Sequence, residues 1–183
     1  MAEARDQDPA AGAVPRRDFV ARIAQAAGVA PVVLGLLEGT ATALPRSEET
    51  DFAVLYAALA LEHHAIAVYD EGLKRGLVPP GLREYAVEFR GDHLGHRDTQ
   101  IAIAEERGGR PPAPLDRYEL GPLRTADDLL RQALEIEVAA QRAYLAVISQ
   151  IRTKDYLLSA AFILVDEVRH TTVWRRVLGL AIY

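Results

Sequence analysis

Apolar residues recur at intervals of three and four along four long segments of this 183-residue chain. Such spacing places them on one face of a helix, because an α-helix turns once every 3.6 residues. Alanine and leucine are frequent, which also favours helix. The chain is therefore predicted to be all-α, with helices from Ser47 to about Lys74, from about Leu82 to Arg107, from Thr125 to about Arg152, and from Asp155 to about Leu178.

Residues that favour helix starts support these boundaries. Ser47 and Thr50 are both candidate N-caps of the first helix, and Thr125 with Asp128 three residues later matches a capping box at the start of the third. Asp155 is predicted to cap the fourth helix.

The lengths of the connections constrain the topology. Short links join the first helix to the second and the third to the fourth, whereas a long segment, 108–124, separates the second helix from the third. This pattern predicts two antiparallel hairpins joined by a long crossover. An up-down-up-down bundle is the alternative, and it would need no long crossover.

Each apolar stripe is interrupted near its middle by side chains that can bind metal. Burying one ionised carboxylate without a partner costs on the order of tens of kcal/mol by ideal solvation, and no lysine or arginine occupies these stripes. A single such residue would suggest a misjudged register or a side chain that reaches solvent. Six of them on four helices predict a shared metal site, because carboxylate and imidazole suit iron, manganese and zinc: Glu62, His93, His96, Glu137, Glu167 and His170.

An internal repeat supports this interpretation. Tyr69 follows Glu62 at the same offset as Tyr144 follows Glu137, and His96 follows Glu62 at nearly the same offset as His170 follows Glu137. The chain is therefore predicted to contain two copies of one helical hairpin. Packing about a pseudo-twofold axis would bring all six groups to one level.

The segment Glu167-Val168-Arg169-His170 matches the Glu-x-x-His motif of ferritins, bacterioferritins, rubrerythrins and manganese catalases, and Glu62 and Glu137 match the single glutamates of the other helices. The chain thus resembles the ferritin-like superfamily over roughly residues 47–178. The resemblance implies two metal ions bound to a four-helix bundle. Glu167 would bridge them and be the catalytic residue, and the terminal ligands would be Glu62, His96, Glu137 and His170.

The second helix departs from the family pattern, because it reads His93-Leu94-Gly95-His96 where a second Glu-x-x-His is expected. A carboxylate can bridge two metals, whereas a neutral imidazole binds one. We therefore expect His93 to be an extra ligand of the metal held by this helix. An asymmetric pair, a single metal, or a metal more tolerant of imidazole would all fit. Asp92 is an alternative ligand if the helix is rotated slightly.

Residues beside these ligands are expected to play smaller roles. His63 and His64 are predicted to be solvated or to support the neighbouring ligand. Tyr69 and Tyr144 are predicted to fill core volume, with a hydrogen bond to the site or a radical relay as the alternative. Asp166 is expected to orient a ligand or to form a solvated salt bridge.

Charge and composition exclude several functions. The formal net charge of −5 argues against nucleic-acid binding, since no basic stripe is available to neutralise phosphates. The absence of cysteine excludes disulfides, thiolate zinc sites, iron–sulfur clusters and cysteine nucleophiles. No phosphate loop, nucleotide fingerprint or Ser-His-Asp arrangement is recognisable, so no organic cofactor is expected.

The first 46 residues differ from the rest. Arg16-Arg17-Asp18-Phe19-Val20 precedes a weakly apolar stretch from Ile23 to Leu37, and the small residues Ala41-Thr42-Ala43 follow. This order resembles a twin-arginine (Tat) export signal, which implies the Tat translocase as a partner and a location in the periplasm or elsewhere outside the cytoplasm. We expect a signal and linker over 1–46 and the bundle over 47–183. An amphipathic N-terminal helix on a cytoplasmic protein is the alternative. No other stretch is expected to reach the length of a membrane span.

The leading functional hypothesis is a metal-binding protein that oxidises Fe(II) or reacts with dioxygen or peroxide. It would be a ferroxidase-, peroxidase- or catalase-like oxidoreductase holding two ions, of iron with manganese or zinc as alternatives. Whether the site turns over is left open, and a non-catalytic metal-binding or stress-related bundle is the second hypothesis. Mineral storage would require a hollow shell of chains. The expected partners are metal ions, small oxidants and further copies of the chain in a dimer or larger homo-oligomer.

Overall fold

A computed structural model describes residues 47–182. The predicted export signal in 1–46 lies outside the described residues. The elements, in chain order, are α3 (Glu48–Lys74), the 3-10 turn η1 (Pro80–Leu82), α4 (Arg83–Glu106), α5 (Ala126–Val147), the 3-10 turn η2 (Ile148–Gln150) and α6 (Lys154–Val177). The described part of the chain contains no strand, which confirms the all-α prediction.

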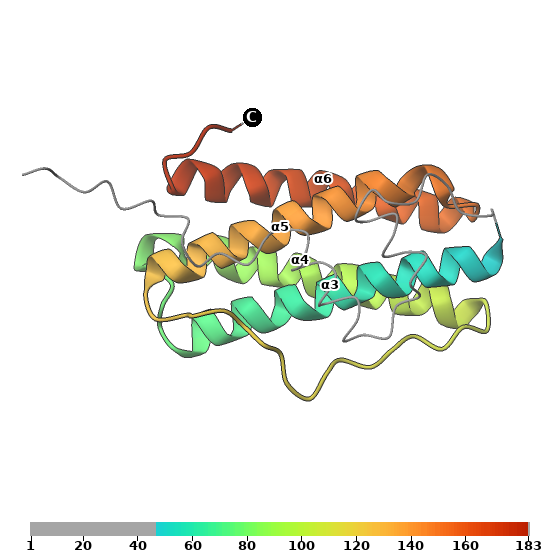
Figure 1. Cartoon of the computed structure of the whole chain (residues 1–183), viewed down its shortest axis with the longest axis horizontal. Coiled ribbons are helices and arrows are strands. Elements are labelled where there is room, and N and C mark those ends of the chain that lie inside the picture. Colours follow the sequence, from blue (N-terminus) through green and yellow to red (C-terminus); the bar gives the residue numbers. More distant parts are fainter. Residues whose placement is uncertain (1–46, 183) are drawn as a thin grey trace, which may run out of the picture.

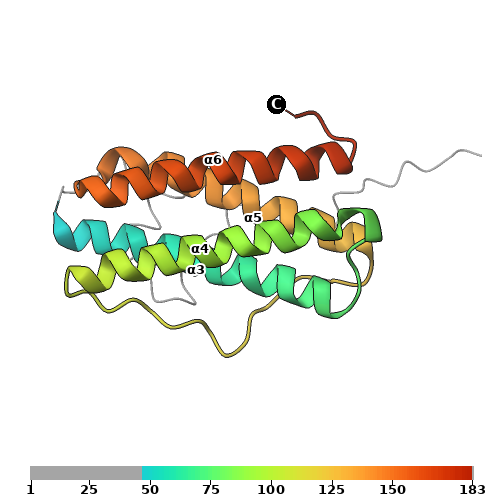
Figure 2. The ribbon, with the colours of Figure 1, turned by 180° about the vertical axis from the view of Figure 1, so that it is seen from behind.

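The four helices form a bundle of two antiparallel hairpins, α3–α4 and α5–α6 (Figure 1). The segment between α4 and α5 runs along the length of the bundle, so that α5 begins at the end where α4 began (Figures 1 and 2). Helix α3 packs on α4 and α5, and α6 packs on the same two helices. The predicted ferritin-like bundle with a long crossover is therefore confirmed.

Two of the predicted N-caps are present. The Ser47 hydroxyl accepts a hydrogen bond from the Thr50 amide at 3.1 Å. The capping box at the start of α5 is complete, because the Thr125 hydroxyl accepts the Asp128 amide at 3.1 Å and the Asp128 carboxylate accepts the Thr125 amide at 2.9 Å. These local signals fix where α3 and α5 begin.

The connection between α5 and α6 differs from the prediction. Helix α5 ends at Val147, not near Arg152, because η2 tightens the chain and Ile151 leaves the helical conformation with a ψ of 123°. Asp155 is not the cap of α6. Thr153 occupies the cap position, and its side chain makes no capping bond.

A carboxylate from another helix satisfies this connection instead. Asp51 of α3 is buried, and its two oxygens accept the backbone amides of Arg152 at 2.9 Å and of Thr153 at 2.8 Å. The prediction of Asp155 was wrong because the partner of these amides comes from a distant part of the chain. Asp51 thereby ties the start of α6 to α3.

The core consists of apolar clusters separated by a polar layer. One cluster lies toward the N-terminal end of α3 and includes Leu55, Tyr156 and Ile163. A second lies toward its C-terminal end and includes Phe89 and Trp174. Along every helix the predicted ionisable residues fall between the positions that build these two clusters. The bundle therefore encloses charged groups at mid-length with apolar packing on both sides.

Helix α3 is long and apolar enough to cross a membrane, a property not expected from the sequence. Its most apolar window is 72% buried inside the bundle. This burial is what a core helix of a packed bundle requires, and it accounts for the hydropathy without a membrane.

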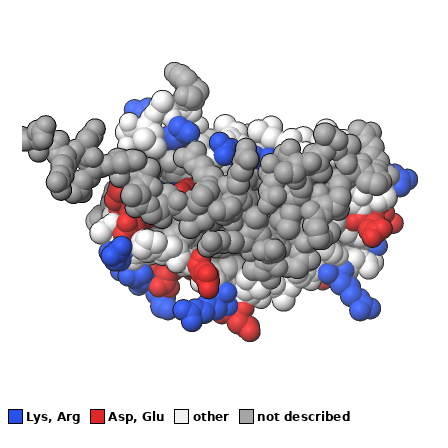
Figure 3. All heavy atoms as spheres, viewed as in Figure 1, with Lys and Arg blue, Asp and Glu red and all other residues white. Residues whose placement is uncertain are grey.

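Charged side chains of both signs share the surface. On the face drawn in Figure 3, Lys and Arg side chains lie beside Asp and Glu side chains along the lower left edge of the molecule. Arg131 pairs with Asp127, and Arg90 pairs with Asp70.

Candidate metal centre

Two overlapping groups of side chains at the middle of the bundle are able to hold a metal ion. Within each group one ligand atom per residue lies within 4.8 Å of the others. His93 and Glu167 belong to both groups, so the six predicted residues form one continuous buried cluster. The first group is Glu62, His93, His96 and Glu167, and the second is His93, Glu137, Glu167 and His170.

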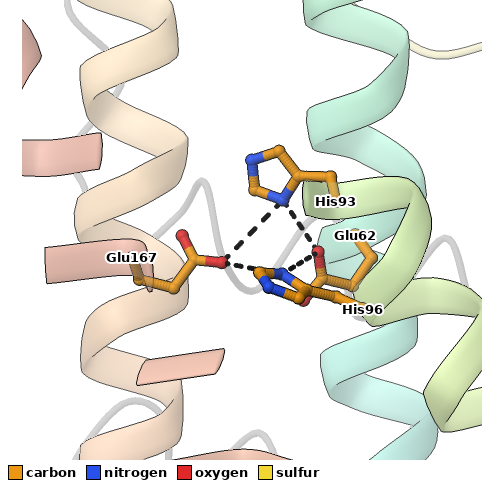
Figure 4. Close-up of side chains that lie close together, drawn as sticks. All are labelled: Glu62, His93, His96 and Glu167. Atoms are coloured by element: carbon orange, nitrogen blue, oxygen red, sulfur yellow. Dashed lines mark hydrogen bonds and ion pairs between the residues drawn. The ribbon is translucent and has the colours of Figure 1, made fainter. Parts of the chain in front are cut away.

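The first group joins α3, α4 and α6 (Figure 4). Oε2 of Glu62 lies 2.8 Å from Nδ1 of His93 and 3.5 Å from Nδ1 of His96. Oε1 of Glu167 lies 3.8 Å and 3.6 Å from the same two nitrogens. Four donor atoms from three helices thus face one point.

The second group joins α4, α5 and α6. Nδ1 of His170 lies 3.3 Å from Oε2 of Glu137 and 4.0 Å from Oε2 of Glu167. Nε2 of His93 lies 3.3 Å from Oε1 of Glu137. The two oxygens of Glu167 therefore face different groups, Oε1 the first and Oε2 the second.

Glu167 lies near three histidine nitrogens but forms no hydrogen bond with them. Its side chain is 0% exposed, and neither carboxylate oxygen has a hydrogen-bond partner among the described residues. The same holds for Nδ1 of His96, which faces Oε1 of Glu167. Buried polar atoms are almost always satisfied, and a carboxylate left without donors is costly. These atoms fit a bound cation, since both are metal-ligand types.

The pKa values describe an uneven distribution of charge. Burial acts to raise the pKa of Glu62, but its contacts with His93 and His96 outweigh it and lower that pKa to about 2. Burial also acts to raise the pKa of Glu137, and the charge of His93 with the His170 contact holds it well below the usual range. Burial and the charge of Glu137 raise the pKa of Glu167 well above its usual range. The third carboxylate is therefore not compensated by the imidazoles around it.

Two tyrosines cross between the hairpins to the terminal glutamates. The Tyr144 hydroxyl of α5 donates to Oε1 of Glu62 on α3 at 3.0 Å, and the Tyr69 hydroxyl of α3 donates to Oε1 of Glu137 on α5. The hydrogen-bonding alternative was therefore correct, although each tyrosine contacts the glutamate of the other hairpin. Tyr69 and Tyr144 therefore do more than fill core volume.

Each tyrosine is itself held by a donor. Nε2 of Gln100 donates to the Tyr144 hydroxyl at 2.6 Å, and Nε1 of Trp174 donates to the Tyr69 hydroxyl at 2.7 Å. Gln100 was recognised only as a member of an apolar stripe. Its polar side chain on that stripe, 0% exposed, was the signal for a role in the site.

Carboxylates on the outer side of the cluster hold two of the histidines. Nε2 of His170 donates to Asp92 at 3.0 Å, and Nε2 of His96 lies 3.3 Å from Asp166. Arg169 contacts both aspartates. Asp92 thus does not replace His93, because α4 turns His93 inward and Asp92 toward α6. The Nδ1 atoms of His96 and His170 are left facing the centre of the cluster.

His63 and His64 are not solvated. They are 6% and 5% exposed, and neither belongs to the two groups. The ring of His64 packs edge-on against Tyr118 of the crossover, with centroids 5.6 Å apart. The prediction of solvated histidines was wrong, because both side chains are buried, and His64 is covered by the crossover, which the helix period alone does not indicate.

The described contacts are related in pairs by the repeat. The offset along the chain from Glu62 to Glu137 equals that from Tyr69 to Tyr144. Four further pairs relate α4 to α6, and their offset along the chain is one residue shorter than the offset between α3 and α5. These pairs are Asp92 and Asp166, His93 and Glu167, His96 and His170, and Gln100 and Trp174. The contacts Tyr69–Glu137 and Tyr144–Glu62 exchange under this relation, as do Asp92–His170 and Asp166–His96.

A bundle of two hairpins with a long crossover and a buried Glu/His cluster defines a ferritin-like protein. The family model of the ferritin-like domain matches residues 50–180, and the chain belongs to this family. It is similar to a conserved hypothetical protein, rv2844, from Mycobacterium tuberculosis, whose crystal structure superposes with a TM-score of 0.67 at 32% identity and covers 73% of this chain and 94% of that one. No curated protein matches the chain.

Proposed function

We propose that this protein binds two metal ions in the Glu/His cluster and uses them to oxidise Fe(II) or to react with dioxygen or peroxide. Iron is the proposed metal, with manganese and zinc as alternatives. The observation that carries the proposal is Glu167, a fully buried carboxylate with neither oxygen satisfied, between two groups of metal-capable side chains. We also propose that the protein acts outside the cytoplasm as a homo-oligomer.

The ligand roles follow the two groups. Glu62 and His96 would hold one ion, Glu137 and His170 the other, and Glu167 would contact both through its separate oxygens. When bound, a pair of metal ions supplies two-electron exchange with a small oxidant. Glu167 is the proposed catalytic residue because it alone contributes an oxygen to each group.

The surrounding residues prepare this centre. The hydroxyls of Tyr69 and Tyr144 hold the terminal glutamates in position. The apolar clusters above and below exclude water, which strengthens electrostatic interactions inside. Asp92 and Asp166 are partly exposed and contact His170 and His96, so the α4–α6 side connects these histidines to the surface.

Metal content tests the binding proposal. After aerobic loading with iron, manganese or zinc, the purified full chain is expected to hold about two ions. Fewer than about 0.3 ions per chain with all three metals would contradict the proposal. Glu167→Ala is expected to lower the content, whereas Glu105→Ala, at an exposed glutamate of α4, is the matched control.

Oxidation of ferrous iron tests turnover. Followed optically under air, the wild-type protein is expected to oxidise many equivalents of Fe(II), and Glu167→Ala to lose this activity. The control Glu105→Ala should retain it. A wild-type protein that binds iron without turning over would overturn the oxidoreductase proposal.

A non-catalytic metal-binding role is the second candidate. It is favoured by His93, which stands where the family pattern has a second bridging glutamate and lowers the number of carboxylates in the site. Binding of about two ions with no oxidation of Fe(II) would support it.

A further inference from the structure

His93 lies between the two groups and presents one ring nitrogen to each. Nδ1 is 2.8 Å from Oε2 of Glu62 in the first group. Nε2 is 3.3 Å from Oε1 of Glu137 in the second. The side chain is fully buried, so both nitrogens are directed at ligand atoms and not at solvent.

The histidines on either side are oriented differently. His96 and His170 each direct only Nδ1 at the centre, because Nε2 of each faces an aspartate, Asp166 or Asp92. Each can therefore serve one ion. His93 has no such outer carboxylate among the described residues, and both of its nitrogens remain available to the cluster.

The repeat assigns His93 the place of a bridge. Its counterpart in the other hairpin is Glu167, at the same offset that relates His96 to His170, and the oxygens of Glu167 also divide between the two groups. The repeat relates the other four proposed ligands as Glu62 to Glu137 and His96 to His170, and all four are proposed to be terminal ligands. In this arrangement the position of His93 is equivalent to that of the bridging carboxylate.

We infer that His93 bridges the two metal ions, with Nδ1 bound to the ion of the first group and Nε2 to the ion of the second. This inference rests on the proposed two-metal site and replaces the expectation that His93 serves one ion. When both ring nitrogens bind a cation, neither keeps a proton, so every N–H proton of the His93 ring is released to water. The resulting imidazolate carries the negative charge that a glutamate would have supplied.

Nitrogen NMR of the wild-type protein is the direct test. The full chain is labelled with ¹⁵N in its five histidines and loaded with zinc. His93, assigned by the loss of its signals in His93→Glu, is expected to show two metal-bound ring nitrogens and no ring N–H. His96 and His170 are expected to show one metal-bound nitrogen each. A zinc-loaded His93 with one bound nitrogen and one N–H would overturn the inference.

Zinc titration of variants adds a test by affinity. His96→Gln and His170→Gln should each lower the affinity for one of the two zinc ions, whereas His93→Gln should lower the affinity for both by about tenfold or more. His93→Glu restores a bridging group and should hold both ions tightly. A His93→Gln protein that keeps one ion at wild-type affinity, or a His93→Glu protein that keeps only one, would contradict bridging.

The two proposals fail in distinguishable ways. If the wild-type protein binds no zinc, the metal site itself is absent and the proposed function fails. If it binds two ions while His93 serves only one of them, the proposed function stands and the bridge alone is wrong. Circular dichroism of each variant verifies that the helices are intact.

Discussion

At the scale of single residues, the cluster is organised by exchange between the hairpins. Each terminal glutamate accepts a hydroxyl from the tyrosine of the other hairpin, and each terminal histidine faces an aspartate of the other hairpin. Arg169 contacts both Asp92 and Asp166, so one guanidinium links the two aspartates that face His170 and His96. Metal-binding histidines are generally oriented by such partners.

Asp166 is therefore predicted to affect metal affinity without binding metal. Asp166→Ala should weaken zinc binding by about 10–100-fold, because His96 loses the carboxylate that directs its Nδ1 inward. Calorimetric titration with zinc measures the effect. Asp98→Ala, at an exposed aspartate of α4 that pairs with Arg97, is the control. Equal affinities for the two variants would show that Asp166 is only a surface charge.

At the scale of elements, α6 begins on a contact supplied by α3. The carboxylate of Asp51 accepts the amides of Arg152 and Thr153, and the cap residue of α6 makes no such bond with its own side chain. Hydrogen bonds to a charged group each contribute about 1.5–3 kcal/mol. The α5–α6 connection is consequently anchored to the opposite hairpin.

Asp51→Ala is predicted to lower the free energy of unfolding by about 3–6 kcal/mol, since it removes two hydrogen bonds to a charged group. Asp155→Ala removes an exposed carboxylate in the first turn of α6 and should change the same quantity by about 0.3–1 kcal/mol. Urea unfolding of the apo proteins compares them. A larger effect for Asp155 would restore it as the cap.

The sequence predicts the helices and the buried ionisable residues for one physical reason. The helix period determines which side chains face the core, and it correctly placed Glu62, Glu137 and Glu167 on inward stripes. It carries no information on which helix faces a given side chain. The partners of Asp51 and Asp92 and the exchange of the tyrosines depend on helix rotation, and the burial of His64 depends on the path of the crossover.

At the scale of the whole molecule, the bundle buries one carboxylate, that of Glu167, which the histidines around it do not compensate. Three carboxylates are buried in the middle layer, and the pKa of Glu167 is raised by burial and by the charge of Glu137. A ligand that binds only the folded state stabilises it by mass action. Metal binding and folding are therefore expected to be linked.

Zinc is predicted to raise the melting temperature. At a free concentration of 100 times Kd, a single bound ion adds about 2.7 kcal/mol to the stability of the folded state. Thermal denaturation with zinc and with a chelator measures the shift, which should be several degrees for a domain of this size. Glu167→Ala should show little shift, and an equal shift in both proteins would locate the zinc elsewhere.

The proposed twin-arginine signal in the N-terminal region predicts that the protein is exported from the cytoplasm. Replacing Arg16 and Arg17 by lysine keeps the charge and removes the proposed export signal. In producing cells that have a Tat system, the wild-type protein should be found outside the cytoplasm and the double variant inside. Fractionation followed by immunoblotting measures this, and export of the double variant would contradict a Tat route.

We propose that six buried side chains from four helices share metal ions at one level of the bundle. Diffraction from a zinc-loaded crystal of the protein, recorded at the zinc absorption edge, tests it most directly because anomalous peaks locate zinc without reference to the side chains. We predict two peaks, one beside Glu62 and His96 and one beside Glu137 and His170, with Glu167 contacting both. Zinc found only on the surface, with the centre empty, would contradict the claim.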